Sequence, residues 1–173
     1  MKKKNYLIID GYNIINAWDG LKDIAKVNLE IAREKLVDEI IEYSEYNGYK
    51  TIVVFDAYNV KNSIESTIKN GNIEVVFTKE HQTADSYIEK YITKLSKYDD
   101  VKVATNDYAE QQIILGNGCS RISARELRLD IDKSLSKIRN KRVKFGEKIH
   151  RNRVEEMLDE EVLSKLEKIR KKR

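Results

Sequence analysis

The chain has 173 residues, of which 40% are hydrophobic and 36% charged; this composition predicts a globular domain with its own core and excludes a disordered chain. No apolar run approaches the ~18 residues of a transmembrane helix, and the apolar segment after the basic start is too short for a signal peptide, so we expect a cytoplasmic protein. The single cysteine, Cys119, excludes an internal disulfide and a cysteine zinc cluster.

The net charge of +4 is divided unevenly along the chain. Residues 1–119 contain 15 Lys and Arg against 19 Asp and Glu, whereas residues 120–173 contain 18 against 10. An acidic body with a basic end indicates that the end meets a polyanion while the body binds cations.

The first third of the chain predicts a strand at residues 6–9 and a mixed loop with a short helical piece at 14–25. A long helix follows at 27–47, and a second strand at 51–55. Both strands end on an acid, Asp10 and Asp56, and Gly11 gives the backbone freedom after the first. Gly48 ends the long helix. We interpret Trp18 as the anchor of the loop on the core; the alternative is stacking on a nucleobase.

An irregular polar segment at residues 57–71 comes next, followed by a strand at 73–77 and a helix at 84–95 that Thr83 caps. A strand at 101–104, a helix that ends at about 115 and a short fifth strand at 119–122 complete this part. Strands that alternate with helices predict an α/β domain with a mostly parallel central sheet.

Four aspartates are expected to meet at one edge of this sheet. Asp10, Asp56 and Asp107 each follow a strand, and Asp85 lies in the first turn of a helix, which places them at the carboxyl edge where open α/β sheets bind ligands. Each alone could be a turn residue or a helix cap. Together, as an acid cluster, they repel one another unless a cation lies between them. Glu89 either joins the cluster or pairs with a surface lysine.

The residue types of the acid cluster favour a metal-activated water as nucleophile. No serine–histidine–acid or cysteine–histidine arrangement is evident, and carboxylate oxygens are the ligands that Mg²⁺ or Mn²⁺ prefers. Such an ion lowers the pKa of bound water and stabilises charge on a phosphate. We therefore expect hydrolysis of a phosphodiester that leaves 5′-phosphate and 3′-hydroxyl ends.

The C-terminal third is expected to bind RNA. Ser123 and Glu126 form the pattern of a capping box that opens a helix, and a cationic segment of little periodicity follows at residues 139–153. The cations predicted to contact RNA phosphates are Arg121, Arg125, Arg128, Arg139, Lys141, Arg142, Lys144, Lys148, Arg151 and Arg153. The first three are expected to share one face near the start of the helix. The alternative is a solvated charged surface. We place the boundary between the domain (1–140) and a basic C-terminal extension (141–173) at residue 140.

Four blocks of the sequence resemble the NYN subclass of PIN-like nucleases, and within it the YacP-like group. They are I-I-D-G-Y-N, F-D-A-Y, T-A-D-S-Y-I-E and A-T-N-D-Y, at residues 8–13, 55–58, 83–89 and 104–108. The resemblance implies a PIN-like three-layer α/β/α sandwich that cuts RNA endonucleolytically with Mg²⁺ or Mn²⁺. It also implies cleavage of mRNA in association with the ribosome.

The resemblance assigns roles residue by residue. Asp10, Asp85 and Asp107 match the metal-binding acids, and Asp56 stands at a further acidic position. The neighbouring polar residues of the pattern are Asn13, Thr105 and Asn106.

We predict a metal-dependent endoribonuclease, and two other classes stay open. The same fold could serve a non-catalytic RNA- or ribosome-binding module, against which the four intact acids count. It could also serve a metal-dependent phosphohydrolase of small molecules, which would leave the basic C-terminal third unexplained. The sequence does not indicate an oligomeric state.

Overall fold

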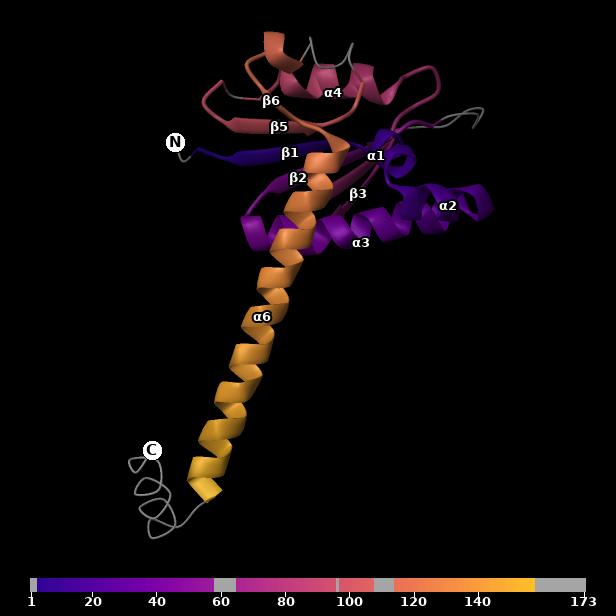
Figure 1. The fold of residues 1–173 in the computed structure, drawn as a ribbon. Coiled ribbons are helices and arrows are strands. Elements are labelled where there is room, and N and C mark those ends of the chain that lie inside the picture. The colour runs from indigo at the N-terminus through magenta and orange to yellow at the C-terminus, as the bar shows by residue number, and fades with distance from the viewer. Residues whose placement is uncertain (1–2, 58–64, 96, 108–113, 158–173) are drawn as a thin grey trace. The chain divides into compact units, whose positions relative to one another are not determined.

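Figure 1 shows the computed structural model of the chain, which describes residues 3–57, 65–95, 97–107 and 114–157. The chain divides into two compact units, Met1–Ser134 and Leu135–Arg173. In the described part of the chain, no helix is both long and apolar enough to cross a membrane.

The first unit alternates strands with helices. Its elements are β1 (Asn5–Asp10), α1 (Gly11–Ala17), α2 (Asp19–Val27), α3 (Leu29–Asn47), β2 (Lys50–Phe55), β3 (Ser66–Asn70), β4 (Ile73–Phe77), α4 (Ala84–Ile92), β5 (Asp100–Ala104), β6 (Ser120–Ile122) and the start of α6 (Ala124–Met157). Gly48 has a left-handed backbone with φ of 70° and ends α3, as predicted.

The sheet has six strands in the order β3-β4-β2-β1-β5-β6. The β3–β4 pair is antiparallel, and all other pairs are parallel. β1 lies at the centre, with Asp10 opposite Val54 of β2 and Ile9 opposite Ala104 of β5. The carboxyl ends of these three strands therefore meet at one edge, and the predicted parallel sheet is confirmed.

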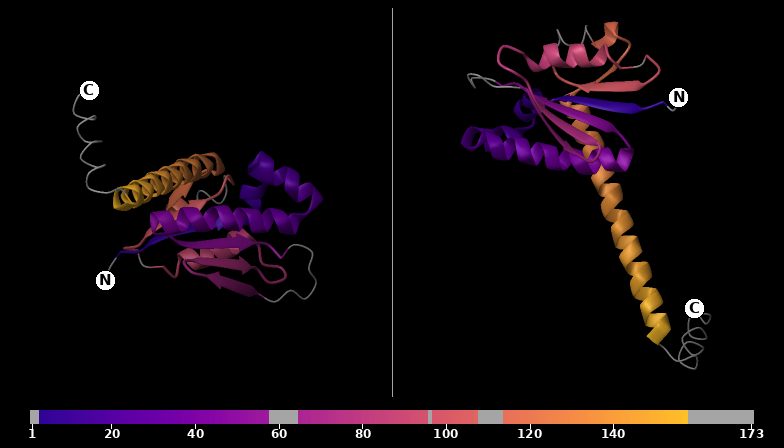
Figure 2. Two further views of the ribbon diagram at one scale, coloured as in Figure 1. Left: turned by 90° about the horizontal axis from the view of Figure 1, so that it is seen from below. Right: turned by 180° about the vertical axis from the view of Figure 1, so that it is seen from behind.

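Helices cover both faces of the sheet (Figures 1 and 2). On one face, Ile88 of α4 shares a hydrophobic cluster with Ile8 and Val54. On the other, α3 buries Leu36 and Ile40 completely. The strands are apolar on both sides because both faces are covered, and the predicted three-layer α/β/α sandwich is confirmed.

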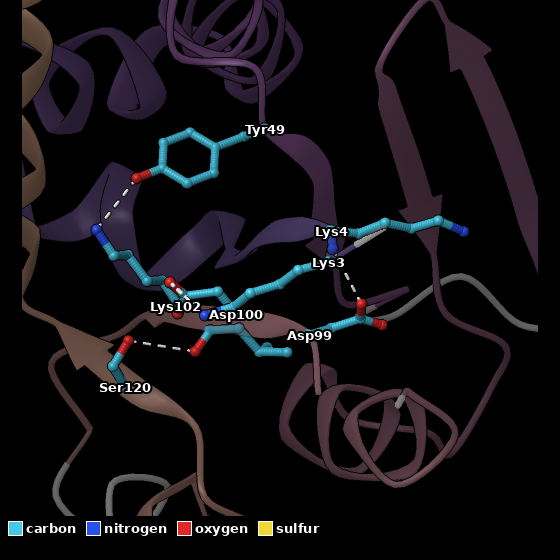
Figure 3. Close-up of polar contacts among 8 residues, drawn as sticks. Lys3, Lys4, Tyr49, Asp99, Asp100, Lys102 and Ser120 are labelled. Atoms are coloured by element: carbon cyan, nitrogen blue, oxygen red, sulfur yellow. Dashed lines mark hydrogen bonds and ion pairs between the residues drawn. The ribbon is translucent and has the colours of Figure 1, made fainter. Parts of the chain in front are cut away.

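The amino edge of the sheet pairs its charges. The backbone N–H of Lys4 donates to Asp99 Oδ1 at 3.1 Å, and Lys3 Nζ lies 3.8 Å from Asp100 Oδ2. Figure 3 shows these residues at the starts of β1 and β5. These contacts join the starts of β1 and β5, so the acids at this edge each have a donor or a cation beside them.

The loop expected at residues 14–25 is helical instead. α1 begins after Asp10, and α2 follows at once, ending where Asn28 caps α3 by accepting from the N–H groups of Glu30 and Ile31. Two short helices that change direction at Trp18 break the apolar spacing, which hid them in the sequence. The anchoring role of Trp18 is confirmed: it is 7% exposed, and its Nε1 donates to the Ala124 carbonyl at 2.8 Å.

The segment expected to be irregular at residues 57–71 contains a strand, β3, at Ser66–Asn70. All five of its residues are exposed, so the alternation of apolar and polar residues that marks a half-buried strand is missing. It pairs with β4 across a tight turn at Gly71, whose φ is 57°. Residues 58–64 of that segment, and residues 108–113 of the helix expected up to 115, lie outside the described residues.

α6 also differs from the prediction. The capping box at its start is confirmed, since the Ser123 N–H donates to Glu126 Oε2 at 2.8 Å and the Glu126 N–H to Ser123 Oγ at 3.2 Å. The segment at 139–153, expected to be irregular, continues as helix to Met157. Arg, Lys and Glu are good helix formers, and one interior glycine costs only ~1 kcal/mol.

Gly11 is required by packing and not by a special backbone angle. A Cβ there would clash with Cε1 of Phe55, whose ring is completely buried. We predict that Gly11→Ala lowers the free energy of unfolding by ~1–3 kcal/mol, as overpacking does in other cores. Chemical denaturation measures this change.

Gly20→Ala is the matched control, because no atom lies within 4 Å of a Cβ at that helical position. Alanine should be neutral or stabilising there by up to ~1 kcal/mol. Equal stability of the two variants would contradict the packing role of Gly11.

Candidate active site

Asp10 is both the last residue of β1 and the N-cap of α1. Its Oδ1 accepts a hydrogen bond from the Asn13 N–H at 3.0 Å. Burial, and after it the charges of Asp85 and Asp56, raise the pKa of Asp10 to about 6, although the N–H groups of Asn13 and Tyr12 act to lower it. Removal from water therefore outweighs the helix cap.

Asp56 and Asp85 approach from two other elements. Asp56 follows β2, and the Ala84 N–H at the start of α4 donates to its carboxylate, but burial still raises the pKa of Asp56. Its Oδ1 is buried and has no hydrogen-bond partner among the described residues. Asp85 lies in the first turn of α4, where burial and then the charges of Asp107 and Asp56 raise its pKa.

The structure thus brings the acid cluster together at the carboxyl edge of the sheet. The charges of Asp85 and Asp56 act on Asp10, and those of Asp107 and Asp56 act on Asp85. Among the described residues, however, no three His, Cys, Asp or Glu side chains are gathered closely enough to hold a metal ion as they stand. Glu89 is exposed one turn further along α4.

Asn13, Thr105 and Asn106 organise the loop that carries Asp107. Asn13 Oδ1 accepts from the Asn106 N–H at 2.9 Å, and Asn106 Oδ1 accepts from the Ala124 N–H at 2.9 Å. The Asp107 N–H donates to Oγ1 of the buried Thr105 at 3.0 Å. These bonds fix the backbone of Asp107 relative to β1 and to the first turn of α6.

Tyr12 and Arg33 flank the acid cluster, and the sequence reasoning missed Arg33. Its Nη1 donates to the Tyr12 hydroxyl at 3.2 Å, and its guanidinium lies 5.5 Å from the ring centroid of Phe77. Burial raises the pKa of Tyr12 and the Asp56 charge adds to the effect, while Arg33 lowers it. The two residues lie 21 positions apart on different helices, so no local pattern joins them.

The predicted RNA-contacting cations have different surroundings. Arg121 lies in β6, not on the helix, and its Nε donates to the Thr105 carbonyl at 3.1 Å. Arg128 is bound to Glu39, whereas Arg125, Arg139 and Lys141 are exposed. The remaining members of the set lie on the helical backbone of α6, and their side chains are outside the described structure: Arg142, Lys144, Lys148, Arg151 and Arg153.

A mostly parallel sheet between helical layers, with acids collected at its carboxyl edge, defines a PIN-like α/β/α domain. The family model of the YacP-like NYN domain matches residues 7–171, and the chain belongs to this family. NYN domains are generally nucleases, so membership supports a nuclease-like function that involves RNA.

The chain is similar to YacP of Bacillus subtilis both in sequence and in structure. The chain is 41% identical to the uncharacterized protein YacP of strain 168 over 166 residues, which cover 95% of this chain and 96% of that protein. It resembles the crystal structure of Rae1 (YacP) with 40% identity and a TM-score of 0.73, over 96% of this chain and 94% of that chain. A crystal structure of a single-residue variant of Rae1 gives 39% identity and a TM-score of 0.70, over 82% of both chains.

The raised pKa of Asp10 makes the metal-free protein less stable as pH rises. Because the folded-state pKa of about 6 exceeds the ordinary 3.8, folding favours the protonated acid, and stability falls from pH ~4 through ~6. A shift of this size corresponds to ~3 kcal/mol above pH 6. We predict that Asp10→Asn, which keeps an acceptor for the Asn13 N–H, removes most of this dependence.

Denaturant unfolding with a chelator present, at pH 5 and at pH 8, measures the effect. Asp38→Asn, at an exposed position of α3, is the control and should keep the wild-type dependence. A profile of Asp10→Asn that matches the wild type would show that burial does not disfavour the charged carboxylate.

Proposed function

We propose that the protein is a metal-dependent endoribonuclease and that the acid cluster is its active site. The observation that carries the proposal is the raised pKa of Asp10, Asp56 and Asp85, which arises from burial and, for Asp10 and Asp85, also from repulsion among the acids. A site that gathers carboxylates at such a cost favours a cation.

The donor set fits Mg²⁺ or Mn²⁺. Carboxylate oxygens are hard ligands, and the buried Asp56 Oδ1, without a hydrogen-bond partner in the described part of the chain, is an acceptor that a cation would satisfy. Asp10, Asp56, Asp85 and Asp107 would hold the metal. When bound, such a metal supplies a water of lowered pKa and stabilises charge on the phosphate.

The protein's own polar residues position the acids. We assign Asn13 to holding the Asp107 loop against β1 through Asn106, and Thr105 to fixing the backbone of Asp107 through its hydroxyl. The acid cluster repels the RNA backbone when no cation is bound, so substrate binding depends on cations elsewhere. Arg125, on the first turns of α6, is an exposed candidate.

On the family resemblance we propose that the substrate is mRNA and that the ribosome is a partner. The second candidate is a non-catalytic RNA- or ribosome-binding module. It is favoured by one observation: within the described residues, no three ligands are already gathered around a metal position.

Asp85→Asn separates the two functions. If the acid cluster holds the metal, we expect loss of Mn²⁺- or Mg²⁺-dependent RNA cleavage by at least ~100-fold, since removal of a metal ligand or of its orienting shell has effects of this order. RNA binding should persist. The assay follows cleavage of RNA, free and on translating ribosomes, with and without the metal.

Asp23→Asn is the matched control, because Asp23 is an exposed acid of α2 paired with Lys26. It should cleave like the wild type. Unchanged cleavage by Asp85→Asn would sink the assignment of the site, and absence of cleavage by the wild type on both substrates would favour the binding module.

RNA binding should weaken as salt rises, because phosphate contacts release counterions. We predict that Arg139→Gln with Lys141→Gln reduces the slope of log affinity against log salt by about 1.4, at ~0.7 for each single-strand phosphate contact. Lys90→Gln with Lys94→Gln, two exposed lysines at α4, should not change the slope. Equal slopes for both pairs, from fluorescence polarisation, would contradict a phosphate-binding role for this part of α6.

A further inference from the structure

A cavity of about 620 Å³ lies between α2, α3 and the start of α6. Trp18 and Leu21 are buried in its wall, and Leu129, which is 49% exposed, gives it an apolar side. Lys35 and Arg125 are exposed residues of its lining. The cavity thus combines an apolar wall with two cations that face water.

Arg128 presents a flat surface in this cavity. Its guanidinium lies 5.1 Å from the ring centroid of Trp18. Its Nη1 is 2.5 Å from Glu39 Oε2 and its Nε is 3.4 Å from Asp132 Oδ1. Two carboxylates offset its charge and hold it over the indole, while 41% of its side chain stays exposed. Arginine planes fixed in this way are surfaces on which unpaired RNA bases stack.

The cavity adjoins the acid cluster through a short series of hydrogen bonds. Asn106 lines the cavity and precedes Asp107. Its N–H donates to Asn13 Oδ1, and the Asn13 N–H donates to Asp10 Oδ1. These bonds connect the lining of the cavity at Asn106 to β1 of the acid cluster, and Asp107 is the next residue along the chain.

We propose that this cavity binds one nucleotide of single-stranded RNA next to the cleaved phosphate. The base stacks on Arg128 and contacts Leu129, and Lys35 and Arg125 bind the phosphate. Arg128 acts here through its plane, since Glu39 and Asp132 already bind its charged edge. The inference rests on the proposed function for the identity of the substrate.

Trp18 is the only tryptophan of the chain, so its emission reports on the cavity. The full chain with Asp85→Asn, in chelator, is titrated with tetraadenylate, and total binding is followed by polarisation of the labelled oligonucleotide. We expect a saturable change in emission. Lys35→Glu and Arg125→Glu should each raise the Kd by at least about tenfold.

Lys94→Glu, the same charge reversal beyond the end of α4, is the matched control and should change the Kd by less than about twofold. Arg128→Lys keeps the charge but loses the plane, and should also weaken binding, with thermal unfolding checking its fold. Ribose 5-phosphate, which lacks a base, should bind at least about tenfold more weakly than adenosine 5′-monophosphate.

Four results would overturn the proposal: no binding of tetraadenylate, binding without a change in Trp18 emission, equal affinity of Lys35→Glu and Lys94→Glu, or equal binding of ribose 5-phosphate and adenosine 5′-monophosphate. Failure of the proposed function looks different. In that case Asp85→Asn retains cleavage, or the wild type cleaves neither free RNA nor RNA on translating ribosomes, whatever the cavity binds.

Discussion

The parallel pairing of β1 with both β2 and β5 is the constraint on which the site depends. These strands lie side by side and run in the same direction, so their carboxyl ends, and the residues that follow them, lie at one edge of the sheet. Phe55 at the end of β2 packs on Gly11, so the first helix starts directly at this edge without a side chain in the way. The first turn of α4 reaches the same place and adds Asp85. The acids meet because of backbone geometry, and their own interactions oppose the meeting.

The repulsion among the acids contributes to the raised pKa of Asp10. Two N–H groups of α1 favour its charged form, yet burial and two neighbouring carboxylates outweigh them, and the net pKa rises to about 6. At the amino edge, Asp99 accepts an N–H hydrogen bond and Asp100 has a lysine beside it. The raised pKa of Asp10, Asp56 and Asp85, in spite of the N–H donors to Asp10 and Asp56, is a physical reason to interpret the carboxyl edge as a site and not as a set of turn residues.

The sequence predicted what depends on local pattern. The buried strands, Gly48 at the end of α3 and the capping box at Ser123 each carry a short-range signal, and the order of strands and helices was enough to bring Asp10, Asp56, Asp85 and Asp107 to one edge. β3 was missed because an exposed edge strand has no apolar alternation, and its pairing with β4 decides its structure. The pairs Tyr12–Arg33 and Glu39–Arg128 join residues far apart in the chain. Only the packing of whole helices brings such pairs together, and the sequence has no signal for it.

The acceptors that hold the Asp107 loop are an amide at Asn13, a hydroxyl at Thr105 and an amide at Asn106. An aspartate in place of either asparagine could accept the same hydrogen bond, and backbone geometry would not distinguish them. Each such exchange would add a fifth negative charge beside carboxylates that already repel one another. Asparagine and aspartate side chains have nearly equal shapes, but they have different roles here. The neutral asparagines hold the Asp107 loop, and the charged aspartates are left to face whatever binds at the acid cluster.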